Sequence, residues 1–276
     1  MTQTLFTSPH IDRVAIALGP LQIRGYTLAY VAGLIGGWWI LRRQIKAGLS
    51  VLSADQLDGL MNACLVGILV GGRLGYVLFY NPSAYLAAPM DVFKVWQGGM
   101  SFHGGFLGVL CAIYLLSRRA SVPFLALGDA VAMAAPLGLF FGRIANFINA
   151  ELYGRVTTSP LGIIFPGAGP DPRHPSQLYE ALSEGILLFC VLFTAYQLKM
   201  RQPASQRRDG HIMALFAMGY GSARYLVEFV REPDAHIGLL INMPFFTLSM
   251  GQLLCLPMIL AGAVLYISIS RKHRNV

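Results

Sequence analysis

Several arginines of this sequence lie inside, or at one end of, strongly apolar stretches. Arg143 and Arg224 are the clearest cases. An ionised side chain in the middle of a membrane-spanning helix costs at least about 2.5 kcal/mol, so such a residue is by default a candidate functional group. Guanidinium is a planar fork that matches the oxygens of phosphate and carboxylate. These residues therefore indicate a binding site for an anion, with phosphate as the favoured group.

The run GYGSARYLVEFVREPD at 219–234 places Arg224 and Glu228 four residues apart. This spacing puts both side chains on one face of a helix, where they can form an ion pair. Two interpretations remain open: the pair holds two helices together, or Arg224 points into a cavity while Glu228 orients it. Arg231, three residues further on, is a weaker candidate near the membrane interface.

The run GRIANFINAELYG at 142–154 gathers four polar side chains within a few helical turns: Arg143, Asn146, Asn149 and Glu151. Such groups need hydrogen-bond partners at a membrane boundary. They are either a polar helix end capped against loops, or a site for an anionic head group in which arginine binds the charge and asparagines bind hydroxyls.

The run SFHGGFLG at 101–108 places His103 at the start of an expected helix, followed by Gly104 and Gly105. Glycines allow another backbone or a substrate to approach closely. His103 is either a structural hydrogen-bonding group or, as a neutral imidazole, an acceptor for a proton near neutral pH. His174, in a loop before Pro175, is the competing histidine.

These groups sit in a chain that is too apolar for an ordinary soluble domain. Of its 276 residues 55% are hydrophobic and 12% charged, and the mean hydropathy is +0.56; soluble domains carry about 25% charge. A bilayer needs about 20 apolar residues per helical span. We expect an all-α polytopic membrane protein, a single domain over 1–276, with about seven spans at 24–41, 59–80, 103–117, 123–142, 178–198, 212–229 and 248–270.

The placement of the positive charge predicts the orientation of these spans. Twelve of the 21 Lys and Arg residues follow the first, third, fifth and seventh spans. Basic connections lie in the cytoplasm, so the N-terminus and the polar connection 143–177 should face outward and the C-terminus inward. The net charge of +8 is thus a topology signal, and we expect no nucleic-acid partner.

The sequence gives no indication of disulfide, metal or cofactor chemistry. The four cysteines lie far apart in apolar stretches and are expected to be small core residues. The sequence contains no GxSxG, HExxH, P-loop or Rossmann glycine motif, so no metal and no cofactor are expected.

The sequence resembles a known protein family in several segments. GRIANFINAELYG matches the signature G-R-x-[GA]-N-F-x-N-x-E-x-x-G of bacterial phosphatidylglycerol:prolipoprotein diacylglyceryl transferases. Further segments look like family segments in the same order, so the resemblance runs from about residue 20 to 265. These segments are GGRLGYVLFYNP, GGMSFHGGFLGV, RHPSQLYE, GYGSARYLVEFVREPD and SMGQ.

The resemblance implies transfer of a diacylglyceryl group from phosphatidylglycerol to the lipobox cysteine of a prolipoprotein signal peptide, with glycerol phosphate released. It implies seven spans in the bacterial inner membrane, a periplasmic N-terminus, a cytoplasmic C-terminus and a site toward the periplasmic leaflet. The short connection between Gly154 and Arg173 predicts a small periplasmic cap.

The resemblance also implies roles for individual residues. Catalysis is assigned to His103, Arg143 and Arg224; substrate binding to Arg143, Asn146, Glu151, Gly154, Arg224 and Tyr26; and support to Glu228, Gly104 and Asn149. Relatives commonly carry Trp-Tyr-Gly in the first span, whereas this chain reads Arg24-Gly25-Tyr26-Thr27, so Tyr26 matches by identity alone.

His103 or a carboxylate such as Glu151 would take the proton of the thiol. A transporter or flippase for an anionic lipid, which needs no base, is the alternative function. A structural scaffold is disfavoured by the number of costly charges.

Overall fold

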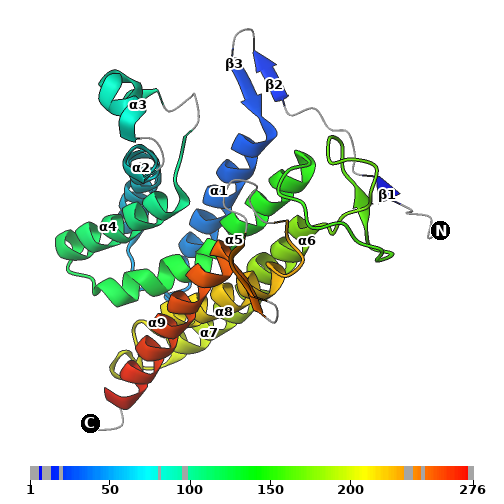
Figure 1. Ribbon diagram of the computed structural model, residues 1–276. Helices are drawn as coiled ribbons and strands as arrows, with labels where there is room; N and C mark the ends of the chain where they lie inside the picture. The colour runs from blue at the N-terminus through cyan, green and yellow to red at the C-terminus, as the bar shows by residue number, and fades with distance from the viewer. Residues whose placement is uncertain are drawn as a thin grey trace. The chain divides into compact units, whose positions relative to one another are not determined.

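The computed structural model describes residues 6–7, 14–18, 21–79, 82–94, 99–232, 239–243 and 246–272. The chain divides into two compact units. The first comprises Met1–Ile40 and Asp129–Val276, and the second comprises Leu41–Gly128. Helices dominate the described parts of both units (Figure 1).

The first unit contains the helices that matter most for the arginines singled out above. They are α1 (Gly25–Lys46), α5 (Phe124–Ile148), α6 (Ser176–Glu180), the π-helical segment η3 (Ala181–Leu187), α7 (Leu188–Arg201), the short 3₁₀ turn η4 (Ala204–Gln206), α8 (His211–Val227) and α9 (Met250–Lys272). The last turns of α1 and the first turn of α5 belong to the second unit. Helices α8 and α9 pack along each other.

Short strands complete the first unit. In the described part of this unit they form three two-stranded pairs: β1 (Phe6–Thr7) parallel to β4 (Ile163–Ile164), β2 (Val14–Leu18) antiparallel to β3 (Leu21–Arg24), and β5 (Leu239–Met243) antiparallel to β6 (Phe246–Ser249). The β2–β3 hairpin leads directly into α1, and β6 leads directly into α9.

Helices α6, η3 and α7 form one uninterrupted helical rod over Ser176–Arg201. The rod follows Pro175, a residue that suits a helix start because the missing amide hydrogen has no intrahelical partner there. Its π-helical turn is wider than an α-turn, and such insertions occur frequently at functional sites. Glu180 immediately precedes this turn and Glu184 lies inside it.

A buried charge cluster holds the start of α8. Asp129 is completely buried; its Oδ2 accepts hydrogen bonds from the Gly210 amide at 2.8 Å and the Lys199 ammonium at 2.7 Å, and its Oδ1 accepts from the Met213 amide at 2.8 Å. Lys199 also contacts Asp209 at 2.6 Å. The carboxylate satisfies amides that a helix start leaves without partners, which ties the beginning of α8 to α5 and to the end of α7.

The start of α9 is closed by a reciprocal cap. The Ser249 amide donates to Gln252 Oε1 at 3.1 Å, and the Gln252 amide donates to Ser249 Oγ at 3.2 Å. This is a capping box, and the sequence S-M-G-Q supplies it directly.

The second unit is built on two helices in close contact. Its elements are α2 (Ala54–Phe79), α3 (Pro82–Ala87), the 3₁₀ turn η1 (Pro89–Phe93) and α4 (Phe102–Ala120). A Cβ added at Gly104 of α4 would collide with the Gly71 carbonyl of α2, so only glycine allows the two backbones to approach this closely. Gly104 therefore has a packing role, whatever else it does.

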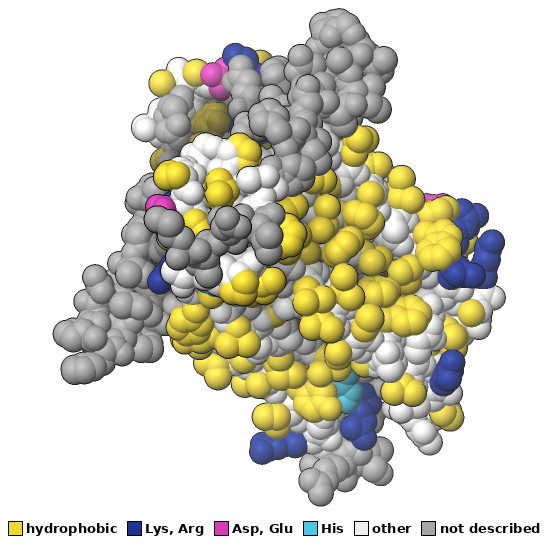
Figure 2. Space-filling view, turned by 90° about the vertical axis from the view of Figure 1, so that its right-hand side faces the viewer, with side chains coloured by type: hydrophobic (Ala, Val, Ile, Leu, Met, Phe, Trp, Pro, Cys, Tyr) yellow, Lys and Arg dark blue, Asp and Glu magenta, His cyan; other side chains and the backbone are white. Residues whose placement is uncertain are grey.

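Among the residues that the structure describes, four helical segments are long and apolar enough to cross a membrane. They are Ala54–Leu78, Phe124–Ile148, Ser176–Arg201 and Gly251–Arg271. Hydrophobic side chains cover much of the described surface, and Figure 2 shows them as a broad area with Lys and Arg side chains gathered toward its edges. The chain is thus a mostly helical protein with the features of an integral membrane protein.

Each stretch predicted as a span coincides with a helix, but two predictions need correction. Arg143 to Ile148 belong to α5, whereas they were expected in the connection 143–177; the Arg–Asn run continues the helix because it contains no residue that breaks it. Cys64 and Cys255 are buried as expected, but Cys111 and Cys190 are exposed. An apolar stretch on a membrane helix has an outward face too, and composition does not distinguish the two faces.

Candidate active site

Arginines and glutamates from three helical regions of the first unit meet in one cluster. Arg143 of α5 contacts Glu180 (Nε–Oε2 3.1 Å) and Glu184 (Nη2–Oε2 3.2 Å). Arg224, in the last turn of α8, contacts Glu180 (Nη1–Oε1 2.5 Å) and Glu228 (Nη2–Oε2 2.6 Å). Glu180 thus joins the two arginines, one to each carboxylate oxygen. We refer to these five residues as the Arg–Glu cluster.

The cluster is nearly closed to solvent. Glu180 and Glu184 are completely buried, and the side chains of Arg143 and Arg224 are 16% and 11% exposed. A buried charge is tolerated only when it is paired and hydrogen-bonded. Two other groups lie nearby: Arg231 Nη1 is 3.9 Å from Glu180 Oε1, and Tyr220 interacts electrostatically with Arg143 and Arg224.

Local sequence explains how these side chains converge. In the Ser176–Arg201 rod Glu180 and Glu184 are four residues apart, so both reach Arg143 from one side. Arg224 and Glu228 have the same spacing at the end of α8, and they form the ion pair that this spacing predicts. Glu228 Oε1 also accepts a hydrogen bond from Ser249 Oγ at 2.8 Å, which ties the cluster to the start of α9.

A second polar group follows α5. Glu151 Oε1 accepts hydrogen bonds from Asn146 Nδ2 at 2.8 Å and Asn149 Nδ2 at 3.3 Å. Ala150 and Leu152, on either side of Glu151, both have positive φ values, +53° and +56°. Such a backbone is unfavourable for non-glycine residues and is typical of sites where the surrounding structure fixes it.

The start of the Ser176–Arg201 rod fixes this tight turn. Gln177 Nε2 donates to the Glu151 carbonyl at 2.7 Å, and Ser176 Oγ donates to the Leu152 carbonyl at 3.0 Å. Gln177 and Ser176 are completely buried. The turn that carries Glu151 is thus attached to the helix that carries Glu180.

Gly154 lies where three backbone segments converge. Its amide donates to the His174 carbonyl at 2.8 Å, and it forms a β-bridge with Arg231. A Cβ at this position would lie 2.5 Å from the Val230 carbonyl oxygen and 2.6 Å from the His174 Cβ. No larger residue fits without displacing the backbone, so the signature glycine permits the packing of the loop beside the cluster.

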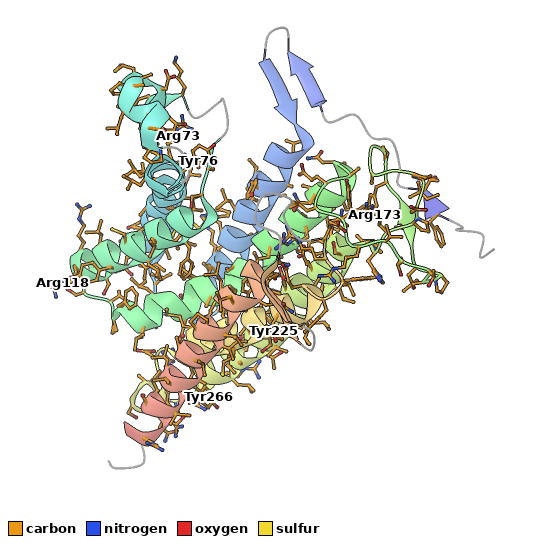
Figure 3. All side chains as sticks on the ribbon, viewed as in Figure 1. Arg73, Tyr76, Arg118, Arg173, Tyr225 and Tyr266 are labelled. Atoms are coloured by element: carbon orange, nitrogen blue, oxygen red, sulfur yellow. The ribbon has the colours of Figure 1, made fainter. Side chains whose placement is uncertain are left out.

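The loop between Gly154 and Pro175 has its own polar anchors. Arg173 (labelled in Figure 3) donates to the Gly154 carbonyl at 3.2 Å, contacts Glu232 at 3.1 Å and lies over the Tyr153 ring. His174 Nδ1 is 3.4 Å from the Tyr179 hydroxyl, and partial burial lowers the pKa of His174. The neutral imidazole that results at neutral pH is the form that accepts a hydrogen bond from the phenol.

The structure brings together most of the predicted site residues. Arg143, Arg224 and Glu228 belong to the Arg–Glu cluster. Asn146 lies near the end of α5, and Asn149, Glu151 and Gly154 lie in the segment that follows this helix. Tyr26 lies in the first turn of α1 and His103 in the first turn of α4, but their side chains lie outside the described residues. Gly104 lies in the second unit, at the α2–α4 contact.

Sequence reasoning predicts no role for Glu180 or Glu184. Their spacing in the sequence could have indicated a role, because two acids four residues apart inside an apolar stretch require basic partners. Within the described part of the chain, no group of three or more His, Cys, Asp or Glu side chains is placed to hold a metal ion.

The chain as a whole is similar to known proteins of one family. A sequence model of the prolipoprotein diacylglyceryl transferase family matches residues 13–268. The chain is 52% identical over 262 residues to a protein of Methylocella silvestris named phosphatidylglycerol–prolipoprotein diacylglyceryl transferase, with 93% of each chain covered. Proteins of the same name from Nitratidesulfovibrio vulgaris (strain DP4) and Pseudoalteromonas atlantica are 49% and 45% identical. These matches cover 94% of each chain in the first case, and 99% of this chain and 95% of the relative in the second.

Proposed function

The chain belongs to the prolipoprotein diacylglyceryl transferase family, and from this premise we propose that it transfers the diacylglyceryl group of phosphatidylglycerol to prolipoproteins. The observation that carries the proposal is that Arg143 and Arg224, from two different helices, converge on the buried Glu180. Two guanidinium groups held this close suit a phosphate group, which offers several oxygens to planar donors.

The reaction is a displacement at the glyceryl carbon that carries the phosphate. The sulfur of the lipobox cysteine forms a bond to that carbon, and the carbon–oxygen bond to phosphate breaks. Glycerol phosphate leaves with the electron pair, the thiol proton passes to a base, and the product is a thioether. A free thiol has a pKa near 8.5, so only a few per cent is ionised at neutral pH and a base accelerates the reaction.

Arg143 and Arg224 would bind the phosphate and stabilise the negative charge that develops as it leaves. In the structure both guanidinium groups are already occupied by carboxylates at 2.5–3.2 Å. We infer that the phosphate replaces one of these carboxylate oxygens. Glu180 is the partner that both arginines share, so its displacement frees a donor on each. Donors in a site that excludes water act more strongly than in bulk solvent.

The neighbouring turn supplies the other proposed substrate contacts. Asn146 and Asn149 hold the Glu151 carboxylate, which would either take the thiol proton or bind a hydroxyl of the head group. His103 is the other candidate base. Gly154 allows the loop to approach, Tyr26 is a further proposed substrate contact, and Glu228 and Gly104 support the site.

We propose that the chain crosses the bacterial inner membrane seven times as one membrane domain, without a cofactor. Its N-terminus and a small cap formed by the 149–177 connection would lie in the periplasm, and its C-terminus in the cytoplasm. Lys199, Arg201, Arg207 and Arg208 lie at the ends of α7 and α8 opposite the Arg–Glu cluster. Because basic connections stay in the cytoplasm, the cluster would belong to the periplasmic leaflet.

The test uses purified protein in detergent with phosphatidylglycerol and a synthetic lipobox peptide. We expect the peptide mass to increase by one diacylglyceryl group and glycerol phosphate to appear in equal amount. A peptide with serine in place of the cysteine is the control and should stay unmodified. A lipid transporter or flippase, the alternative, would leave phosphatidylglycerol intact in this assay.

A further inference from the structure

A second polar region lies at the opposite end of the helices that carry the Arg–Glu cluster. A cavity of about 630 Å³ opens where α7 ends and α8 begins. The loop between the two helices contributes Gln202, Ser205, Gln206 and Arg208 to its lining. This region takes no part in the proposed transfer reaction, which would occur about a helix length away.

The lining of this cavity contains the basic residues Lys199 and Arg208 and no acidic residue. Arg208 is half-buried, and no acid of the described residues is paired with it. Asp129 and Asp209 both contact Lys199, at 2.7 and 2.6 Å, and neither belongs to the lining. A partly buried guanidinium that has no carboxylate partner can bind phosphate oxygens, and neighbouring amide and hydroxyl groups can donate further hydrogen bonds to them.

The walls of the cavity become apolar toward the helices. Ala195 and Leu198 of α7 and Leu215 of α8 line this part, together with Tyr266 of α9 (labelled in Figure 3). The Tyr266 ring lies 4.7 Å from the ring of His211, whose Nε2 is 3.2 Å from Ser270 Oγ. Aromatic side chains with a polar edge are typical of the membrane–water interface.

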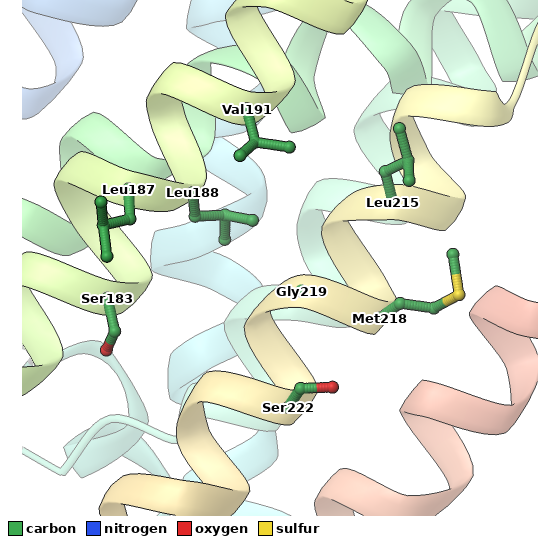
Figure 4. Close-up of a pocket in the computed structure, with 8 residues that line it drawn as sticks. All are labelled: Ser183, Leu187, Leu188, Val191, Leu215, Met218, Gly219 and Ser222. Atoms are coloured by element: carbon green, nitrogen blue, oxygen red, sulfur yellow. The ribbon is translucent and has the colours of Figure 1, made fainter.

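The apolar wall continues along the same two helices. Leu215 also lines a second cavity, of about 390 Å³, together with Leu188, Val191 and Met218 (Figure 4). The two cavities thus follow one face of α7 and α8, with a polar, basic end at Arg208 and an apolar remainder. This is the polarity of a phospholipid: one charged phosphate and a long acyl chain.

We propose that this groove binds an anionic phospholipid of the leaflet opposite the Arg–Glu cluster, with its phosphate at Arg208 and an acyl chain along Leu198, Leu215 and Val191. Charge argues against a signal peptide as the occupant, because the basic segment that precedes its apolar core would lie beside Arg207 and Arg208. Basic pockets between transmembrane helices are known to take anionic head groups.

The experiment measures lipid retained by the full-length protein, without lipobox peptide, in native mass spectrometry after incorporation into nanodiscs that contain phosphatidylserine. We expect Arg208→Gln to retain about fivefold less lipid than the wild type, as one basic residue contributes about this much near a membrane surface. Arg208→Lys, which keeps the charge, should retain most of it. The matched control is Arg201→Gln, which removes an equal charge from an exposed residue outside the lining.

A second pair tests the acyl chain. Ala195→Trp fills the apolar part of the cavity and should reduce retention, whereas Thr194→Trp places the same ring on an exposed neighbour and should not. All variants keep Arg143 and Arg224, so lipid bound at the Arg–Glu cluster contributes equally. Equal retention by Arg208→Gln and Arg201→Gln would overturn the proposal. So would displacement of the lipid by millimolar inorganic phosphate, which would make this a site for the free ion.

Discussion

The substitution Glu180→Gln replaces the carboxylate shared by Arg143 and Arg224 with a neutral amide of nearly the same shape. The side chain is completely buried, and its two oxygens contact the arginines at 3.1 and 2.5 Å. Removal of one partner from a buried ion pair costs about 3–5 kcal/mol, mostly because a charge is left uncompensated. Arg143 keeps Glu184 and Arg224 keeps Glu228, so we expect the lower end, about 3 kcal/mol.

Thermal unfolding in detergent micelles, followed by circular dichroism, measures this loss. For a chain of this size a change of 1 kcal/mol shifts Tm by about 2–4 °C, so Glu180→Gln should lower Tm by about 6–12 °C. Two matched variants provide Tm shifts for comparison. Glu184→Gln removes a carboxylate that contacts one arginine instead of two, and its shift should be smaller. Glu232→Gln breaks an ion pair with Arg173 in which the glutamate is 49% exposed, which is worth about 0–1 kcal/mol.

The order of the three shifts is the decisive result. A Tm for Glu180→Gln equal to that of Glu232→Gln would refute the reasoning, because it would mean that the shared carboxylate stabilises no more than an exposed one. A higher Tm than that of the wild type would also refute it. That outcome would show that the cost of desolvating the Glu180 carboxylate exceeds its Coulomb attraction to the arginines.

Three further predictions concern single residues. Arg143→Lys keeps the charge but loses the fork, so the turnover of the proposed transfer should fall by about a hundredfold or more, measured as glycerol phosphate released per folded protein. Gly154→Ala should destabilise the protein strongly, because its Cβ would lie 2.5 Å from a backbone oxygen, whereas Gly142→Ala, with no atom within 4 Å, should leave Tm unchanged or raised. Because burial lowers the pKa of His174, the folded state favours its neutral form; its contribution to stability is present above about pH 6.5 and is lost as the pH falls through the lowered pKa. Thermal scans between about pH 7 and pH 5 should therefore show a smaller decrease for His174→Asn than for the wild type.

The sequence predicts the helices well because their signal is local. Long apolar stretches mark the positions of α2, α5, the Ser176–Arg201 rod and α9. The spacing of Arg224 and Glu228 predicts their ion pair, because four residues bring two side chains to one helix face. The capping box at Ser249 is likewise local, because it involves only four consecutive residues.

The contacts that assemble the site are not local, and here the sequence is insufficient. Glu180 lies 37 residues after Arg143 and 44 before Arg224, so only the packing of α5, α6 and α8 shows that it joins them. The hydrogen bond from Asn146 to Glu151 closes a turn in which Ala150 and Leu152 have positive φ values, which no sequence rule indicates for these residue types. The exposure of Cys111 depends on which face of α4 is turned outward.

Charge balance within the Arg–Glu cluster bears on lipid selection by the proposed transferase. Arg143 and Arg224 are already compensated by three glutamates, two of them completely buried. A lipid without a phosphate group offers no anion that can replace a carboxylate at a guanidinium, so exchange would leave an arginine less well compensated than before. An anionic phosphodiester does offer one, and the displaced carboxylate then becomes available to accept a proton. The selectivity of the cluster would therefore rest on the phosphodiester group rather than on the length of the acyl chains, which would lie outside the cluster.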